Sequence, residues 1–204
     1  DLFEPLAMCH RSLVACGMRS IADGALLDTL RRVACFGVHL ARLDIRQSAE
    51  EHTRVLDEIT RHLGITDASG GGYADWDERS RQMFLVQELE GRRPLFPQRW
   101  PASDEAREVL ETCRVVAEQG PEPFGQYIIS MAAAPSDVLA VILLLREAGL
   151  ESPIPVVPLF ETLDDLDGAP ACMRSALGIE WYRRWSDDHQ HVMIGYSDSA
   201  KDGG

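Results

Sequence analysis

Two carboxylate residues, Glu161 and Asp198, each follow a short apolar segment, and each is followed directly by a hydroxyl residue, Thr162 or Ser199. Carboxylate oxygens are hard ligands that suit Mg²⁺ or Mn²⁺, and such ions keep coordination positions open for substrate oxygens. A structural interpretation competes, because the same residue types are common where helices begin. By spacing alone, helix capping is the commoner explanation, so both interpretations stay open.

Two basic residues, like these acids, stand at or just after the end of a short apolar segment. Arg46 ends an otherwise apolar segment, where a guanidinium can hold a phosphate or a carboxylate through two hydrogen bonds. The competing interpretation, which the sequence slightly favours, is a structural ion pair with Asp44 or with an acid of a neighbouring strand. Lys201 can add positive charge at the same place, although an exposed lysine between Asp198 and Asp202 more often forms a solvated ion pair.

The elements that must position these side chains are four short segments rich in β-branched or aromatic residues, which predict buried strands. Helices are expected between them, the pattern of βα units around a parallel sheet. In a parallel α/β barrel, chemistry is assembled at the carboxyl ends of the strands. Proline cannot donate to a strand ladder, so Pro155 and Pro158 weaken the third segment. The predicted strands cover residues 38–46, 126–131, 154–160 and 192–197.

Helix caps predict that the rest of the chain is mostly helical. Ser48 with Glu51 three residues later has the form of a capping box. The helix that Ser136 opens is apolar nearly all round, so we expect it to be buried. Further helices are predicted to begin at Asp75 and at Ser103, and residues 1–36 predict two more that are broken near residues 17–24.

Composition excludes several classes of protein. A net charge of −13 argues against nucleic acid or an anionic membrane as the main partner. The longest apolar run, residues 138–145, is far shorter than the roughly 20 residues of a membrane span, and no signal peptide is visible. Five scattered cysteines without a CxxC pair predict reduced, buried thiols, which suits a cytoplasmic protein.

Familiar catalytic motifs are absent from the sequence. The six histidines form no HxxxH or HExxH pattern, and His189 and His191 are expected in a surface turn rather than in a metal site. No GxGxxG, P-loop or GxSxG motif occurs, so nucleotide binding and serine hydrolysis lack support. The residues by themselves therefore predict an acidic α/β barrel portion with a candidate metal and anion site, for which the capping and ion-pair alternatives stay open.

Four segments taken together resemble bacterial-type phosphoenolpyruvate carboxylases. Residues 192–204, VMIGYSDSAKDGG, are similar to the family's signature segment, and residues 158–166, PLFETLDDL, are similar to the stretch that carries its other metal ligand. RLDIRQ at 42–47 and ISMAAAPSDVLAV at 129–141 also resemble family segments and follow in the family's order. The likeness runs over nearly the whole chain, so residues 1–204 are identified as the central part of a single catalytic domain of this family.

The resemblance implies an irregular, helix-rich, TIM-like barrel and a carboxy-lyase that converts phosphoenolpyruvate and bicarbonate to oxaloacetate and phosphate, through carboxyphosphate and a metal-stabilised enolate. Glu161 and Asp198 match the family's ligands for Mg²⁺ or Mn²⁺, Arg46 matches an arginine near the substrate phosphate, and Lys201 matches a lysine of the signature segment. The family also implies a cytoplasmic, allosteric homotetramer that feeds the tricarboxylic acid cycle.

The sequence departs from the family pattern in places. Ser48 stands where the family often has a glutamate, and Gly203 replaces the usual alanine. The chain does not begin with Met and ends in glycines, so we expect a piece of a larger protein. The family's catalytic histidine and its glycine- and arginine-rich loop have no counterpart in these 204 residues, and the chain alone is therefore expected to be inactive.

Two other functions are compatible with the residues. The first is another enolate-forming enzyme on an α/β barrel, which would share the metal, the carboxylates and the arginine without needing bicarbonate. The second is a helical interaction module without enzymatic activity, in which the polar residues after the strands are only caps.

Overall fold

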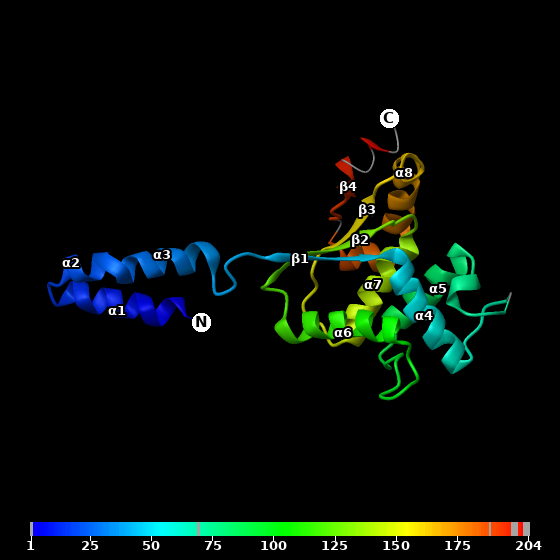
Figure 1. Cartoon of the computed structure of the whole chain (residues 1–204), viewed down its shortest axis with the longest axis horizontal. Helices are drawn as coiled ribbons and strands as arrows, with labels where there is room; N and C mark the ends of the chain where they lie inside the picture. Colours follow the sequence, from blue (N-terminus) through cyan, green and yellow to red (C-terminus); the bar gives the residue numbers. More distant parts are fainter. Residues whose placement is uncertain (1, 69, 188, 197–199, 202–204) are drawn as a thin grey trace. The chain divides into compact units, whose positions relative to one another are not determined.

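The computed structural model describes residues 2–68, 70–187, 189–196 and 200–201 (Figure 1). The chain divides into two compact units, Asp1–Arg42 and Leu43–Gly204. The assignment of residues 1–204 to one catalytic domain stays a prediction.

The first unit is a helical hairpin, as the sequence predicts. Helix α1 (Phe3–Ala15) ends before Gly17, whose positive φ of 75° breaks the helix, and the chain returns through the short α2 (Arg19–Ile21), a π-helical turn (Ala22–Leu26) and α3 (Leu27–Phe36). Of the described residues of this unit, only Ala22 and Leu30 are buried. Its three cysteines are exposed, so the prediction of buried thiols is wrong there and right only for Cys113 and Cys172.

The second unit is built on a parallel sheet with the strand order β1-β2-β3-β4. This arrangement confirms the predicted mixed α/β, predominantly helical fold. The described strands form an open row, and closure into a TIM-like barrel stays a prediction. The strands are β1 (Leu43–Ser48), β2 (Phe124–Ser130), β3 (Val156–Phe160) and β4 (Met193–Ile194).

The predicted start of the first strand, residue 38, is wrong. Gly37 and Leu40 have positive φ angles of 59° and 60°, which bend the chain through turns, and extended backbone begins only at Leu43. The apolar residues of this segment imitate a strand pattern, but the left-handed backbone interrupts it. The third strand begins after Pro155, whose carbonyl accepts a 2.8 Å hydrogen bond from the Tyr127 N–H. In the fourth predicted strand, only Met193–Ile194 is extended among the described residues.

The helices of the second unit largely follow their predicted caps. The capping box at Ser48 is present at the start of α4 (Ala49–Leu63), with the Ser48 N–H donating to Glu51 Oε2 at 2.9 Å. Ser103 caps α6 (Asp104–Gln119) as predicted. The helix expected from Asp75 begins later, because Tyr73–Asp75 forms a 3₁₀ turn and Asp77 is the true N-cap of α5 (Glu78–Glu90).

The two faces of the sheet are packed differently. Helices α4, α5, α6 and α7 (Pro135–Glu147) lie on one face, and α7 is buried along most of its length, as predicted (Figure 1). Successive strand residues point to opposite faces, so Tyr127 and Ile129 join the large helical core while Ile128 joins a small cluster with Val157 and Leu159 on the other face. Helices α8 (Leu163–Gly178) and α9 (Glu180–Trp185) follow β3.

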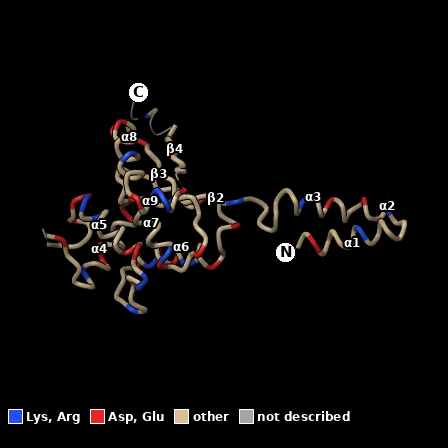
Figure 2. The backbone as a smooth tube through the Cα atoms, turned by 180° about the vertical axis from the view of Figure 1, so that it is seen from behind, with Lys and Arg blue, Asp and Glu red and all other residues tan. Residues whose placement is uncertain are grey.

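The charged residues are distributed over both units, and many of them form ion pairs. Acidic and basic residues are interspersed along the backbone (Figure 2), and several form pairs within one helix, such as Arg54 with Glu50 at 3.4 Å and Arg61 with Asp57 at 2.8 Å. None of the described helices has the length and hydropathy that a bilayer crossing requires.

Candidate functional site at the carboxyl end of the sheet

Arg46 and Glu161 meet where β1 and β3 end. Arg46 lies opposite Ile128 in the β1–β2 register, and Glu161 comes two positions after Leu159, so both side chains belong to the face with the small cluster. The Arg46 Nη2 donates to Glu161 Oε1 at 2.6 Å, although the two residues are 115 positions apart. The fold therefore brings two of the predicted site residues into direct contact across β2.

Glu161 is the most deeply placed group of this site, with 7% of the residue exposed. Its second oxygen, Oε2, accepts a 3.1 Å hydrogen bond from the Met131 N–H. Met131 follows β2 and has a positive φ of 56°, a conformation that costs a non-glycine residue about 1–2 kcal/mol. Such backbone strain persists where the surrounding structure requires it and is frequent at functional sites. Here it accompanies an amide aimed at the carboxylate.

The expectation that a residue at this position caps the next helix is confirmed for Thr162 and not for Glu161. The Thr162 side chain accepts from the Asp165 N–H at 3.1 Å, and Asp165 Oδ2 accepts from the Thr162 N–H at the same distance, which completes a capping box at the start of α8. The Glu161 carboxylate does not cap this helix and points to the Arg46 side of the sheet.

The ion-pair interpretation of Arg46 is confirmed, but the partner is Glu161 after β3, one strand beyond the neighbouring β2. Asp44, the other candidate, instead accepts from Gln126 Nε2 at 3.2 Å. The pair does not bury the arginine, since 52% of its side chain is exposed. The guanidinium is therefore accessible to an anion in solution on one side, while on the other side it is hydrogen-bonded to Glu161.

Gly195 packs directly against Glu161. Its N–H donates to the Phe160 carbonyl at 3.0 Å, and a Cβ built on Gly195 would lie 3.3 Å from both the Cα and the Cγ of Glu161. A side chain at this position would press on the carboxylate-bearing residue. In the sequence analysis, Gly195 is named only as part of the segment VMIGYSDSAKDGG, and no local pattern indicates this contact.

The other two predicted site residues are Asp198 and Lys201. Asp198 lies outside the described residues, and its role as a metal ligand stays a prediction. Lys201 is exposed, and its role also stays a prediction. Among the residues that the structure describes, no group of three or more histidines, cysteines or acids is arranged to hold a metal.

A buried series of polar side chains lies behind the site, on the helical face of the sheet. His52 of α4 is 1% exposed, its Nε2 is 2.9 Å from the Tyr127 hydroxyl, and that hydroxyl donates to Gln47 Oε1. Burial lowers the pKa of His52 to about 3, so the imidazole is neutral at physiological pH. No local sequence pattern connects His52 to Tyr127, which is 75 positions away.

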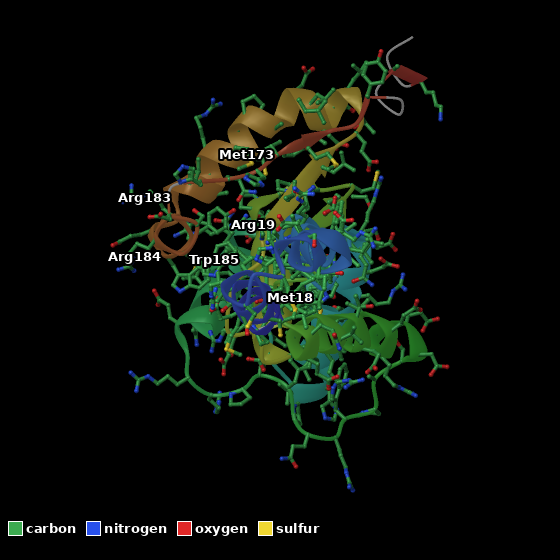
Figure 3. The ribbon with its side chains drawn as sticks, turned by 90° about the vertical axis from the view of Figure 1, so that its left-hand side faces the viewer. Met18, Arg19, Met173, Arg183, Arg184 and Trp185 are labelled. Carbon is green, nitrogen blue, oxygen red and sulfur yellow. The ribbon has the colours of Figure 1, made fainter. Side chains whose placement is uncertain are left out.

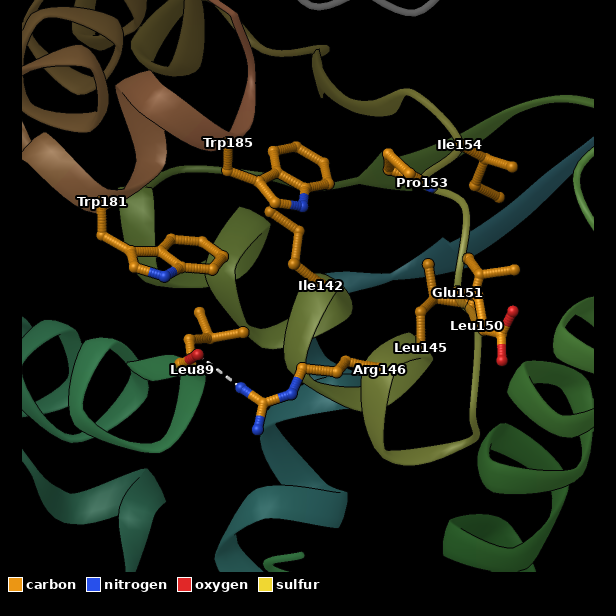
Figure 4. Close-up of a pocket in the computed structure, with 10 residues that line it drawn as sticks. All are labelled: Leu89, Ile142, Leu145, Arg146, Leu150, Glu151, Pro153, Ile154, Trp181 and Trp185. Carbon is orange, nitrogen blue, oxygen red and sulfur yellow. Dashed lines mark hydrogen bonds between the residues drawn. The ribbon is translucent and has the colours of Figure 1, made fainter. Parts of the chain in front are cut away.

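A separate cavity of about 190 Å³ lies at the amino end of β3 (Figure 4). Trp181 and Trp185 stack beside it with ring centroids 6.3 Å apart, and the Arg146 guanidinium donates to the Leu89 carbonyl. Figure 3 shows Trp185 on the same helix as the outward-pointing Arg183. Of the predicted site residues that the structure describes, Arg46, Glu161 and Lys201, none lines this cavity.

Comparison with known proteins gives one consistent result. The family model described as phosphoenolpyruvate carboxylase matches residues 1–204. The chain is 58% identical to a phosphoenolpyruvate carboxylase of Hahella chejuensis, 57% to one of Aeromonas hydrophila and 56% to one of Shewanella sediminis, in each case over 204 residues. These alignments cover 100% of the chain and 23% of each relative, so the chain spans about a quarter of the length of the curated relatives it matches.

Proposed function

Because the chain belongs to the phosphoenolpyruvate carboxylase family, we propose that the full-length protein containing it carboxylates phosphoenolpyruvate with bicarbonate, and that Arg46 and Glu161 lie in the active site. The observation that carries this proposal is the 2.6 Å contact between these two residues at the carboxyl end of a parallel sheet. That edge is where α/β enzymes assemble their chemistry.

The reaction transfers the phosphoryl group of phosphoenolpyruvate to a bicarbonate oxygen, which gives carboxyphosphate and the enolate of pyruvate. Carboxyphosphate then breaks its C–O bond to release carbon dioxide and phosphate, and the enolate carbon forms the new C–C bond of oxaloacetate. Positioning and electrostatic stabilisation carry most of the catalysis in phosphoryl transfer. Stray protonation of the enolate would yield pyruvate, so the site must also exclude water.

Arg46 is the phosphate-binding group in this proposal. Its guanidinium is anchored on one side by Glu161 and half-exposed on the other, so it can bind phosphoryl oxygens through its remaining N–H groups. A bound positive charge at this position offsets the charge that develops on the migrating group. The protein's overall acidity is no obstacle, because the guanidinium acts at short range.

Glu161 and Asp198 are the proposed ligands of Mg²⁺ or Mn²⁺. The donor chemistry of Glu161 fits a hard cation, since both its oxygens accept from cationic or N–H donors and the residue is almost buried. A divalent metal held there supplies Lewis-acid stabilisation of enolate charge. Arg46 and a bound dication would both be attracted to the Glu161 carboxylate, so we propose that the two positive groups would compete for it.

Titration of Mn²⁺ into the full-length protein tests these assignments. We expect Glu161→Gln and Asp198→Asn to weaken Mn²⁺ binding by at least about tenfold, because each removes an anionic ligand. Arg46→Gln is expected to leave Mn²⁺ affinity unchanged or to increase it, while the KM for phosphoenolpyruvate rises. Glu151→Gln, a change of an acid beside the separate cavity, is the matched control. Unchanged Mn²⁺ affinity in both acid variants would remove the metal assignment.

Bicarbonate dependence tests the reaction itself. Phosphate release from phosphoenolpyruvate by the full-length protein should require bicarbonate and should be matched by oxaloacetate. Release without bicarbonate would instead favour a different enolate-forming enzyme. From family membership we also propose Lys201 as an additional positive group of the site, a cytoplasmic location, allosteric control and a homotetrameric assembly of the full-length protein.

A further inference from the structure

We propose that the buried series His52, Tyr127 and Gln47 positions Arg46, so that these three are positioning residues of the phosphate-binding site. This inference rests on the proposed role of Arg46 in the carboxylation reaction. None of the three touches the space beside Glu161 where a substrate would bind, because Gln47 and Tyr127 lie on the helical face of the sheet and Arg46 on the other.

The series acts next to an irregularity in the strand ladder. β1 pairs with β2, and the register of this pairing shifts between Leu43 and Ile45, just before Arg46. The Tyr127 hydroxyl reaches diagonally from β2 to Gln47, the residue directly after Arg46, and fixes the strand beyond the irregularity.

The same hydroxyl also ties the strand end to the helix that follows. His52 lies in the first two turns of α4, which begins directly after β1, and its Nε2 is 2.9 Å from the Tyr127 oxygen. The capping box at Ser48 holds the chain between the two contacts. Arg46 is thus followed by a segment that is hydrogen-bonded at Gln47, at Ser48 and at His52.

The directions of these hydrogen bonds follow from one another. The Tyr127 O–H donates to Gln47 Oε1, so its oxygen accepts, and His52 must donate through Nε2–H. The remaining nitrogen, Nδ1, is then an unprotonated acceptor, in agreement with its burial without a hydrogen-bond partner. A charged imidazole would place an N–H at that buried position without an acceptor, so the series requires neutral His52.

Loss of the central hydroxyl should therefore move the arginine. Tyr127→Phe leaves Gln47 Oε1 and His52 Nε2–H without partners and frees the end of β1. A misplacement of about 1 Å in a group that orients substrate can lower the rate about 100-fold. The effect should appear in reactions that use Arg46 and should be absent from functions that use Glu161 alone.

The chain offers a matched control at the opposite end of the sheet. Tyr182 is likewise buried, and its hydroxyl donates to the side-chain oxygen of a glutamine, Gln190. Gln190 in turn donates to the Val156 carbonyl at the amino end of β3, at 2.8 Å. Tyr182→Phe therefore removes the same kind of buried Tyr–Gln hydrogen bond away from Arg46.

The experiment compares Tyr127→Phe with Tyr182→Phe in the full-length protein, each alone and in the Arg46→Gln background. We expect similar losses in urea midpoint for both, but a fall of about tenfold or more in kcat/KM for phosphoenolpyruvate only for Tyr127→Phe, with Mn²⁺ affinity unchanged. In the Arg46→Gln background, Tyr127→Phe should have little further effect, because a residue that acts only by positioning the guanidinium has nothing to position once the guanidinium is gone. Gln47→Met should repeat the result if Tyr127→Phe does not fold.

Two outcomes would overturn the inference. One is equal kcat/KM for the Tyr127→Phe and Tyr182→Phe variants in an active protein. The other is a loss from Tyr127→Phe that is as large without the Arg46 guanidinium as with it. A wild-type protein that shows no bicarbonate-dependent turnover would overturn the proposed function itself, so the two failures are read from different measurements.

Discussion

Glu161 meets three kinds of neighbour at the end of β3: a guanidinium from β1, a backbone amide after β2 and a glycine after β4. Each neighbour belongs to or follows a different strand, so the position of the carboxylate depends on how all four strands are placed relative to one another. The backbone of Gly195 lies so close to Glu161 that there is little room for a side chain at position 195.

Gly195→Ala is therefore expected to displace Glu161. The added Cβ would lie 3.3 Å from the Cα and the Cγ of Glu161, so one of the two residues must shift by a few tenths of an ångström. We expect Mn²⁺ affinity of the full-length protein to fall severalfold, measured by titration. Gly168→Ala is the control, since a Cβ on Gly168 in α8 would meet no atom within 4 Å. Equal Mn²⁺ affinities for the two variants would show that Gly195 does not set the position of the carboxylate.

At the scale of the element, α4 begins with a capping box and has a titratable residue on its buried face. Its capping box sets the first turn next to β1, and its buried face contains Val55, Leu56 and Ile59 together with one titratable group, His52. The pKa of His52 is lowered from 6.5 to about 3 by burial, so the unfolded chain binds a proton that the folded unit rejects below about pH 6.5.

Acid should therefore destabilise the packing of α4 on β2. The contribution of neutral His52 to stability is intact above about pH 6.5 and is lost progressively as the pH falls from there toward about 3. Between pH 7 and pH 5 the loss amounts to about 2 kcal/mol, because one pKa unit corresponds to about 1.4 kcal/mol. We expect His52→Gln to lose about that much less over the same interval.

Urea denaturation of the 204-residue chain at the two pH values, followed by tryptophan fluorescence, measures this difference. All four tryptophans, at positions 76, 100, 181 and 185, belong to the second unit, so the signal reports on the unit that contains His52. Comparison with the variant removes the contribution of other titrating groups. Parallel pH profiles for wild type and His52→Gln would contradict the expectation.

At the scale of the whole molecule, helices pack against one face of the sheet and form the large core with it. On the other face, the described residues form a small apolar cluster beside Arg46 and Glu161. The polar groups that the structure shows in contact with one another at this edge are the Arg46 guanidinium, the Glu161 carboxylate and the Met131 amide. Transfer of a phosphoryl group and formation of a C–C bond need more charged and proton-handling groups than these.

We therefore expect the purified 204-residue chain to form no oxaloacetate above background. The chain spans 23% of the length of its curated relatives, which leaves most of such a protein to provide the remaining groups. A coupled assay with malate dehydrogenase measures the product directly, with the full-length protein as the positive control. Bicarbonate-dependent oxaloacetate formation by the 204-residue chain would contradict this expectation.

The sequence by itself determined the local features of this protein. Ser48, Ser103 and Gly64 act over a few residues, so the helix ends that they form could be predicted from their neighbours alone. The four β-rich segments between helices predicted a parallel sheet, and all four contain strand residues in the structure. The start of the first strand was wrong because left-handed backbone at Leu40 leaves no mark in a hydropathy pattern.

The tertiary structure alone decided which polar residues meet. Spacing made helix capping the commoner explanation for Glu161 and Thr162, and only the fold shows that Thr162 is the cap and that Arg46 is the partner of the Glu161 carboxylate across 115 positions. The contact of Tyr127 with His52 and Gln47, and that of Gly195 with Glu161, are likewise invisible in local patterns. The reason is physical: strand order and register set these distances, and both result from packing of the whole sheet rather than from any one segment.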